Sequence, residues 1–158
     1  METKVLIPVD TGRNSITAEE YAIKMHWRMP LKVTLLNVLN KKRLEGRGIS
    51  LSDQETILAG MRRLAEGTLA KASEPFQKAQ IEFDTRIEQG NPGLTICRIA
   101  QDENYDMVII PPSGLSEWEE ILGGSVVRMV LQKCMVPVLL VKHGPERLEA
   151  LRKLSSEG

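Results

Sequence analysis

A chain of 158 residues, 42% of them hydrophobic, is long enough to bury the core of a single domain without disulfides or metal ions. Its 21 basic and 21 acidic side chains balance, so no net charge steers the protein toward nucleic acid or an anionic membrane. No stretch is apolar over a length that spans a bilayer or acts as a signal segment, so we expect a cytoplasmic protein with no nucleic-acid or membrane partner.

The first part of the chain is predicted to form a strand, a helix and a second strand. The runs "KVLIPV" (4–9) and "KVTLLNVL" (32–39) are nearly continuous and β-branched, which is typical of strands covered on both faces. Between them, Thr17 and Glu20 fit a capping box, which predicts the start of a helix. The apolar face of that helix would consist of Tyr21, Ile23 and Met25.

A basic loop and a longer helix follow the second strand. We interpret the loop, residues 40–50, as a solvated segment, with a phosphate contact as the alternative. Ser52 and Glu55 fit a second capping box. The helix that they open has a predicted apolar face of Ile57, Leu58, Met61, Leu64, Ala65 and Leu69.

Three more strands are predicted in the second half of the chain. Residues 80–88 alternate between apolar and charged side chains, which indicates a strand with one wet face at an edge of the sheet. Residues 107–110 and 136–141 are nearly continuous apolar runs. Because proline cannot donate a hydrogen bond within a central strand, Pro137 favours the other edge for the last run.

Two helices are predicted to connect these strands. Asn91 and Pro92 are typical of an N-cap and a first helical position, and Gly124 with Ser125 opens the other helix. The whole pattern, with strands alternating with helices, predicts an α/β fold around a mostly parallel sheet.

Ligands of open parallel sheets bind beyond the carboxyl ends of the strands. The segments that follow strands one, two and four are residues 10–12, Asn40 and residues 111–125. The Asp10 carboxylate can accept hydrogen bonds from a base or a ribose, but Asp followed two residues later by Gly is also ordinary turn chemistry. The glycines and the serine of the last segment can bind phosphate at a helix N-terminus, or form a simple N-cap.

The succession "VLIPVD", "GNPGLTICRIA", "DMVII" and a G-x9-G-S spacing before "VPVLLVK" resembles the universal stress protein family over roughly residues 2–142. The resemblance implies an open five-stranded parallel sheet in the order 3-2-1-4-5, with helices on both faces, of the Rossmann-like type that binds adenine nucleotides. It also implies a homodimer and a regulatory role in stress responses, with an unknown protein partner and no established reaction. We therefore expect a universal stress protein domain over residues 1–142 and a C-terminal extension over residues 143–158.

Nucleotide-binding members of that family carry the motif G-x2-G-x9-G-S/T after strand four. The resemblance implies that Asp10 faces the base, that the Gly114 backbone lines the ribose and phosphates, and that Gly124 and Ser125 bind the phosphates. Pro111 replaces the first glycine, and because proline lacks an N–H and fixes φ, we expect weakened ATP binding. The expected site for ATP or another adenine nucleotide, with or without Mg²⁺, comprises Pro8, Val9, Asp10, Thr11, Val38, Pro111, Gly114, Gly124, Ser125 and Val126.

Three enzyme or signalling classes of related fold lack their required residues. A response-regulator receiver needs an acidic pair after strand one and an aspartate after strand three, and neither is present. An ATP pyrophosphatase needs S-G-G-x-D-S and an esterase needs a G-x-S-x-G elbow, and neither motif occurs. We therefore expect a protein that acts by binding rather than an enzyme, with slow ATP hydrolysis left open. The alternative is a nucleotide-free dimeric interaction module.

The last strand presents apolar side chains on both faces at a predicted edge, which needs a cover to prevent aggregation. We expect this cover to be a second copy of the chain, with the two strands antiparallel across a two-fold axis. The residues at the centre of the expected dimer are Val136, Val138 and Leu140.

Beyond the domain, Leu148, Leu151 and Leu154 recur at helical spacing. This spacing predicts a short amphipathic helix that docks on its own subunit or on the partner, a disordered tail being the alternative.

The cysteines and histidines do not form a predicted metal site. Cys97 and Cys134 lie far apart in the sequence, and His26 and His143 do not complete any zinc spacing with them. We expect reduced, structural thiols and no bound metal at these residues.

Overall fold

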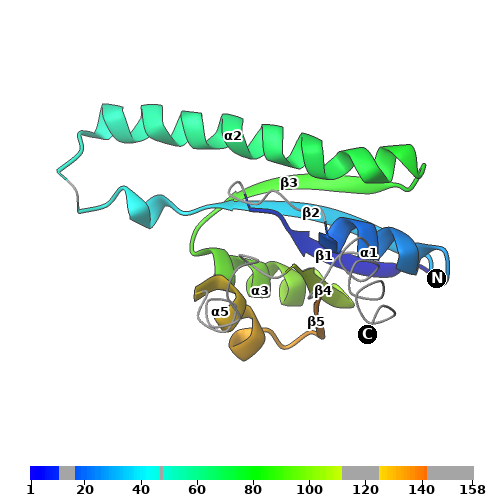
Figure 1. Ribbon diagram of the computed structural model, residues 1–158. Helices are drawn as coiled ribbons and strands as arrows, with labels where there is room; N and C mark the ends of the chain where they lie inside the picture. Colours follow the sequence, from blue (N-terminus) through cyan, green and yellow to red (C-terminus); the bar gives the residue numbers. More distant parts are fainter. Residues whose placement is uncertain (11–16, 47, 112–124, 142–158) are drawn as a thin grey trace, which may run out of the picture.

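The computed structural model describes residues 1–10, 17–46, 48–111 and 125–141, and it shows an α/β fold around one parallel sheet (Figure 1). The strands follow the order β3-β2-β1-β4-β5, and all neighbouring pairs are parallel. Their bounds are β1 (Thr3–Pro8), β2 (Leu31–Leu39), β3 (Phe83–Gln89), β4 (Met107–Ile110) and β5 (Val138–Leu140). The predicted fold class and strand order are confirmed.

The two edge strands are those that the sequence indicates, β3 and β5. Residues 107–110 form a strand with the predicted bounds. In contrast, β5 is shorter than the predicted run 136–141. Pro137 accepts a hydrogen bond from Val108 N–H at 2.9 Å but has no N–H of its own to donate, so regular pairing begins only after it.

Helices cover both faces of the sheet (Figure 1). On one side lie α1 (Thr17–His26) and α2 (Leu51–Lys78), and on the other lie α3 (Pro92–Asp102) and α5 (Ser125–Lys133). A short 3-10 helix, η1 (Lys41–Arg43), follows β2 within the basic loop. No helix within the described ranges has both the length and the apolarity to cross a membrane.

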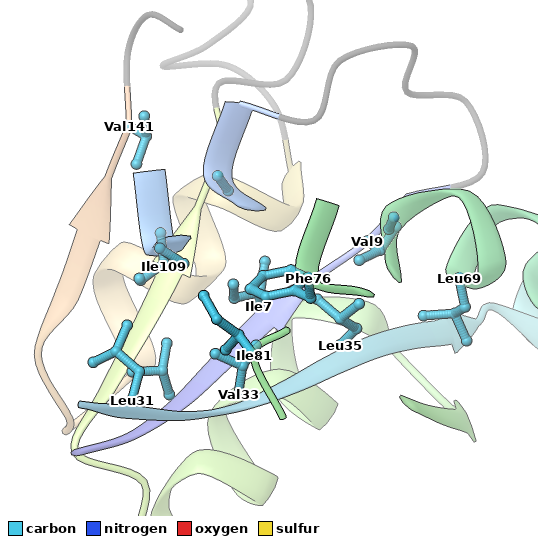
Figure 2. Close-up of a cluster of buried hydrophobic side chains, with 14 residues drawn as sticks. Ile7, Val9, Leu31, Val33, Leu35, Leu69, Phe76, Ile81, Ile109 and Val141 are labelled. Carbon is cyan, nitrogen blue, oxygen red and sulfur yellow. The ribbon is translucent and has the colours of Figure 1, made fainter. Parts of the chain in front are cut away.

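The sheet separates two hydrophobic cores, which we call the α1–α2 core and the α3–α5 core. In the α1–α2 core, Phe76 of α2 packs with Ile7 and Leu35 of the central strands (Figure 2). In the α3–α5 core, Ile96 and Ile99 of α3 pack against the opposite face of the same strands. Both helical layers thus bury the near-continuous apolar runs, which explains why the central strands do not alternate in polarity.

The first predicted capping box is wrong in position, because Thr17 already lies within α1. Ala18 and Ala22 are the fully buried apolar residues of this helix, and the predicted Ile23 and Met25 pack only partly against the α1–α2 core. Tyr21 was predicted on the buried face but is 39% exposed. The buried apolar face of α1 thus consists of small alanines, and the Tyr21 ring lies partly in solvent.

The second predicted capping box is also wrong by two residues. Ser50 is the N-cap of α2, and its Oγ accepts a hydrogen bond from Asp53 N–H at 3.1 Å. Ser52 and Glu55 lie inside the helix. The prediction at α3 is confirmed, since Asn91 Oδ1 accepts from Leu94 N–H at 3.0 Å and Pro92 is the first residue of the helix.

Only part of the predicted apolar face of α2 is buried. Ala65 and Leu69 belong to the buried face, whereas Leu64 is 66% exposed and Ile57 is 38% exposed. Figure 1 shows that the N-terminal part of α2 extends past the ends of the strands. That part of the helix has no sheet beneath it, so its apolar side chains cannot all be buried by the domain.

Candidate functional site

The alternation of side chains along β1 and β2 determines which predicted site residues share one side of the sheet. In β1, Ile7 and the following Val9 belong to the α1–α2 core, while Leu6 belongs to the α3–α5 core. Successive strand residues point to opposite faces, so Pro8 and, in continued extended backbone, Asp10 project toward the α3–α5 side. In β2, Val38 packs against the α3–α5 core and therefore lies on the same side.

The strand register also brings these residues to one level. Pro8 of β1 is the partner of Leu36 of β2. Two residues further along both strands, Asp10 and Val38 come to the carboxyl edge of the sheet next to each other. Asp10 is exposed, Pro8 and Val38 are half-buried, and Val9 is 5% exposed on the opposite face.

A buried side chain that the sequence analysis missed holds the end of β1. Asn37 is 4% exposed, and its Nδ2 donates a hydrogen bond to the Val9 carbonyl oxygen at 2.7 Å. The Val9 N–H donates to the Leu36 carbonyl oxygen, also at 2.7 Å. The backbone that leads into Asp10 is thereby attached to β2 at both polar groups of Val9. The signal in the sequence is a single asparagine inside the apolar run "LLNVL".

The phosphate half of the predicted site is only partly described. Pro111 directly follows β4, which neighbours β1, and it is half-buried. The described part of α5 starts at Ser125, and Val126 is 37% exposed. The other predicted residues, Thr11, Gly114 and Gly124, lie outside the described residues, as do His143 and the predicted tail helix.

Another polar residue lies at this edge directly after β2. Asn40 is half-buried, and its Oδ1 is a buried atom without a hydrogen-bond partner in the described part of the chain. The neighbouring Lys41 and Lys42 of η1 are exposed, in agreement with the interpretation of this segment as solvated.

The described residues offer no metal centre, and the Cys134 thiol is not activated. No group of three or more His, Cys, Asp or Glu side chains in these ranges could hold a metal ion. Burial, followed by a hydrogen bond with Cys97, raises the pKa of the Cys134 thiol to about 12, and both cysteines are free. Because the thiolate is the nucleophile, a thiol with such a pKa is inert at neutral pH. His26 has a structural contact, since its Nδ1 accepts from Leu31 N–H at 3.1 Å.

A groove of about 710 Å³ lies elsewhere, between α2 and the edge strand β3. Leu69 and Ser73 of α2 and Phe83 and Ile87 of β3 contribute to its lining. Leu69 belongs to the α1–α2 core and Phe83 and Ile87 pack against it, so the groove opens on the side of the sheet opposite to Asp10 and Val38. It contains none of the predicted nucleotide-binding residues and is a separate surface feature.

Comparison with known proteins identifies relatives of the whole fold. The model of the universal stress protein family matches residues 1–142. Universal stress protein MJ0577 of Methanocaldococcus jannaschii is 26% identical over 156 residues, which cover 90% of this chain and 96% of that protein. A solved structure of MJ0577 has a TM-score of 0.75 at 24% identity and covers 92% of this chain and 99% of its own.

Two other similar structures contain nucleotides. The universal stress protein from Archaeoglobus fulgidus, solved in complex with dAMP, has a TM-score of 0.63 at 19% identity and covers 89% of this chain and 98% of its own. A universal stress protein family member from Arabidopsis thaliana, solved with AMP bound, has a TM-score of 0.64 at 18% identity and covers 92% of this chain and 94% of its own.

Proposed function

This chain belongs to the universal stress protein family, and we propose that it is a cytoplasmic regulatory protein that binds an adenine nucleotide at the carboxyl ends of β1 and β4. The observation that carries the proposal is the placement of Asp10 and Val38 at one level on one side of the sheet, beside β4. The AMP and dAMP complexes of the Arabidopsis and Archaeoglobus proteins support an adenine nucleotide as the ligand class.

The proposed roles divide the nucleotide between two halves of the site. The Asp10 carboxylate and the Val38 backbone would bind the base and ribose, where the bonds of Asn37 hold the strand end in place. The N-terminal turn of α5, which includes Ser125, would bind the phosphates, because the N–H groups and the dipole at a helix N-terminus favour an anion. Pro111 replaces a residue that can donate an N–H, so we expect the affinity for ATP to be weakened rather than abolished.

We propose that the protein acts by binding and not by catalysis. Asp10 is an exposed carboxylate directly after β1, and the sequence contains no G-x-S-x-G elbow that would present a nucleophile. The nucleotide would then act as a switch for a protein partner. A measurement of ADP release from ATP over hours tests this point, and steady turnover would contradict it.

Titration calorimetry with AMP and ATP tests the proposed ligand. We expect saturable binding of both, and mass spectrometry of small molecules released from freshly purified protein should detect an adenine nucleotide. The Asp10→Asn variant keeps the size of the side chain but removes its charge and one of its two acceptor oxygens, so it should bind both nucleotides more weakly. Absence of any binding by the wild type would contradict the proposal.

A nucleotide-free dimeric interaction module is the second candidate, and Pro111 is the observation that favours it. The proline ring and the missing N–H stand where a ribose would approach β4. In that case the segment after β4 is a connection only, and AMP or ATP would leave the melting temperature of the protein unchanged.

A further inference from the structure

Asn40 has an unsatisfied polar atom at the carboxyl edge of the sheet. Its Oδ1 is buried without a hydrogen-bond partner in the ranges that the structure describes, and its side chain does not cap η1. Nearly all buried polar groups in native proteins are paired, so an unpaired amide oxygen calls for a physical reason. A buried oxygen without a partner carries a desolvation cost, which a leucine of similar size would avoid.

The position of Asn40 relates it to Asp10 and Val38. Its backbone has φ −87° and ψ 89°, close to the extended region, so the alternation of β2 continues approximately through it. Leu36 and Val38 pack on the α3–α5 side, and Asn40 is the next residue of that parity. A planar ligand seated against Asp10 and Val38 would therefore meet Asn40 one step further toward the open end of the sheet.

An amide oxygen is an acceptor, so it discriminates between purine bases by the group that they present. Adenine carries an amino group on C6, which is a donor, whereas hypoxanthine and guanine carry an oxygen there. With hypoxanthine or guanine, the oxygen on C6 would face the Asn40 Oδ1, and two acceptors cannot form a hydrogen bond with each other. Sites that hydrogen-bond one ligand group in this way reject the analogue that lacks it, because a buried polar group is then left unpaired.

We propose that Asn40 is a specificity-determining residue, and that its Oδ1 accepts a hydrogen bond from the 6-amino group of the bound adenine. This assignment rests on the proposed function. It gives the unsatisfied Oδ1 of Asn40 a partner in the bound state, and it makes the site prefer 6-amino purines to 6-oxo purines.

Calorimetric titration with AMP and with inosine monophosphate, which has an oxygen in place of the amino group, tests the assignment. The wild type should prefer AMP by about tenfold, the effect of a single hydrogen bond. Asn40→Leu should lose this preference through weaker AMP binding, with little change for inosine monophosphate. The matched control is Gln89→Leu, which removes an exposed amide at the end of β3 and should behave as the wild type.

Two further measurements separate a ligand role from a structural role. Asn40→Asp keeps the acceptor and removes the amide donor, so the preference for AMP should persist. The melting temperature of Asn40→Leu without nucleotide should equal or exceed that of the wild type, because an unpaired buried oxygen is removed. A clear fall in that melting temperature would overturn the assignment, since it would reveal a partner in the fold itself.

The remaining outcomes of the titrations also decide whether Asn40 determines specificity. An unchanged ratio of AMP to inosine monophosphate affinity in Asn40→Leu overturns the role of Asn40 and leaves the nucleotide site intact. A wild-type preference for inosine monophosphate would mean that the amide donates instead of accepting, and it overturns the assignment as well. If the wild type binds neither compound, the proposed function fails and the assignment fails with it.

Discussion

At the residue scale, the polar side chain of Asn37, inside the apolar strand β2, fixes the backbone that leads into Asp10. Asn37 of β2 is buried, and its Nδ2 donates to the Val9 carbonyl oxygen, directly after β1, at 2.7 Å. The Val9 N–H is bonded to β2 as well, so Asp10 follows backbone that cannot move independently of that strand. Asn37 thus contributes to both stability and binding, although it need not touch the ligand.

Replacing Asn37 by leucine should therefore weaken both properties. The buried Val9 carbonyl loses its amide donor, which costs about 1–3 kcal/mol. For a chain of this size the melting temperature falls by roughly 2–4 °C per kcal/mol, so we expect a decrease of several degrees in calorimetry. The exposed Gln89→Leu change should stay within about 0.5 kcal/mol of the wild type. An unchanged melting temperature in Asn37→Leu would contradict this prediction. It would mean that the hydrogen bond stabilises the fold by no more than the cost of burying the amide.

Pro111 is the second residue for which a single substitution should change the affinity for ATP. Proline fixes φ near −65° and has no N–H, whereas glycine at this position permits close approach of backbone and ligand. Pro111→Gly should bind ATP more tightly by about 1 kcal/mol, and Ser125→Ala should weaken the binding. Pro30→Gly is the matched control, because Pro30 is exposed and directly precedes β2. It also makes the unfolded chain more flexible, but it should leave the affinity for ATP unchanged. Equal ATP affinities in the wild type, Pro111→Gly and Ser125→Ala, measured by calorimetry, would favour the nucleotide-free module.

At the scale of elements, the start of α2 shows why local patterns are ambiguous. Two overlapping segments fit the capping rule, Ser50 with Asp53 and Ser52 with Glu55. The structure uses the first, with Ser50 Oγ accepting from Asp53 N–H and donating to Asp53 Oδ2 at 2.6 Å. The choice depends on where the chain turns after η1, and a pattern of four residues does not contain that information.

Ser50→Ala and Ser52→Ala form a matched pair that tests this cap. Loss of the Ser50 cap costs about 1 kcal/mol of helix stability, whereas Ser52 is already helical and alanine is a better helix former. Because the first turns of α2 bury little surface, the cost should appear as local fraying rather than as global unfolding. Hydrogen exchange of the amides in the first turns of α2 should become about fivefold faster in Ser50→Ala only. Equal exchange in both variants would contradict the assignment of the cap.

The elements that the sequence predicts correctly are those whose pattern has one physical solution. The apolar run 107–110 is short and is followed directly by proline, which favours a buried strand, and Asn91 with Pro92 combines an N-cap residue with one that suits the first helical position. The apolar face of α2 was predicted too broadly, because periodicity indicates which side chains could be buried but not whether a sheet extends beneath them. Asn37 could not be assigned from the sequence either, since its partner Val9 lies 28 residues away.

At the scale of the whole molecule, the open parallel sheet explains where the candidate site lies and why β5 has an unpaired side. The carboxyl ends of all the strands lie at one edge of the sheet, so Asp10, Asn40 and Pro111, which follow three neighbouring strands, lie at the same edge although they are far apart in the sequence. The same arrangement leaves β5 with neighbours on one side only. Its residues, Val138 to Leu140, are only half-buried in a single chain, and the preceding Met135 is 82% exposed.

The last prediction is a two-fold dimer that covers β5. Val136, Val138 and Leu140 pack only partly against the α3–α5 core, and a second copy pairing antiparallel along β5 would complete their burial. Sedimentation at micromolar concentration should therefore show a dimer. Met135→Lys places like charges on both subunits beside this strand and should shift the protein toward monomer without unfolding it, because the side chain is already exposed. The control is Trp27→Lys. Trp27 is 72% exposed and directly follows α1, which covers the face of the sheet opposite to α3 and α5. This substitution should leave the dimer unchanged. A wild type that sediments as a monomer, or equal dissociation in both variants, would place the association surface elsewhere or exclude it.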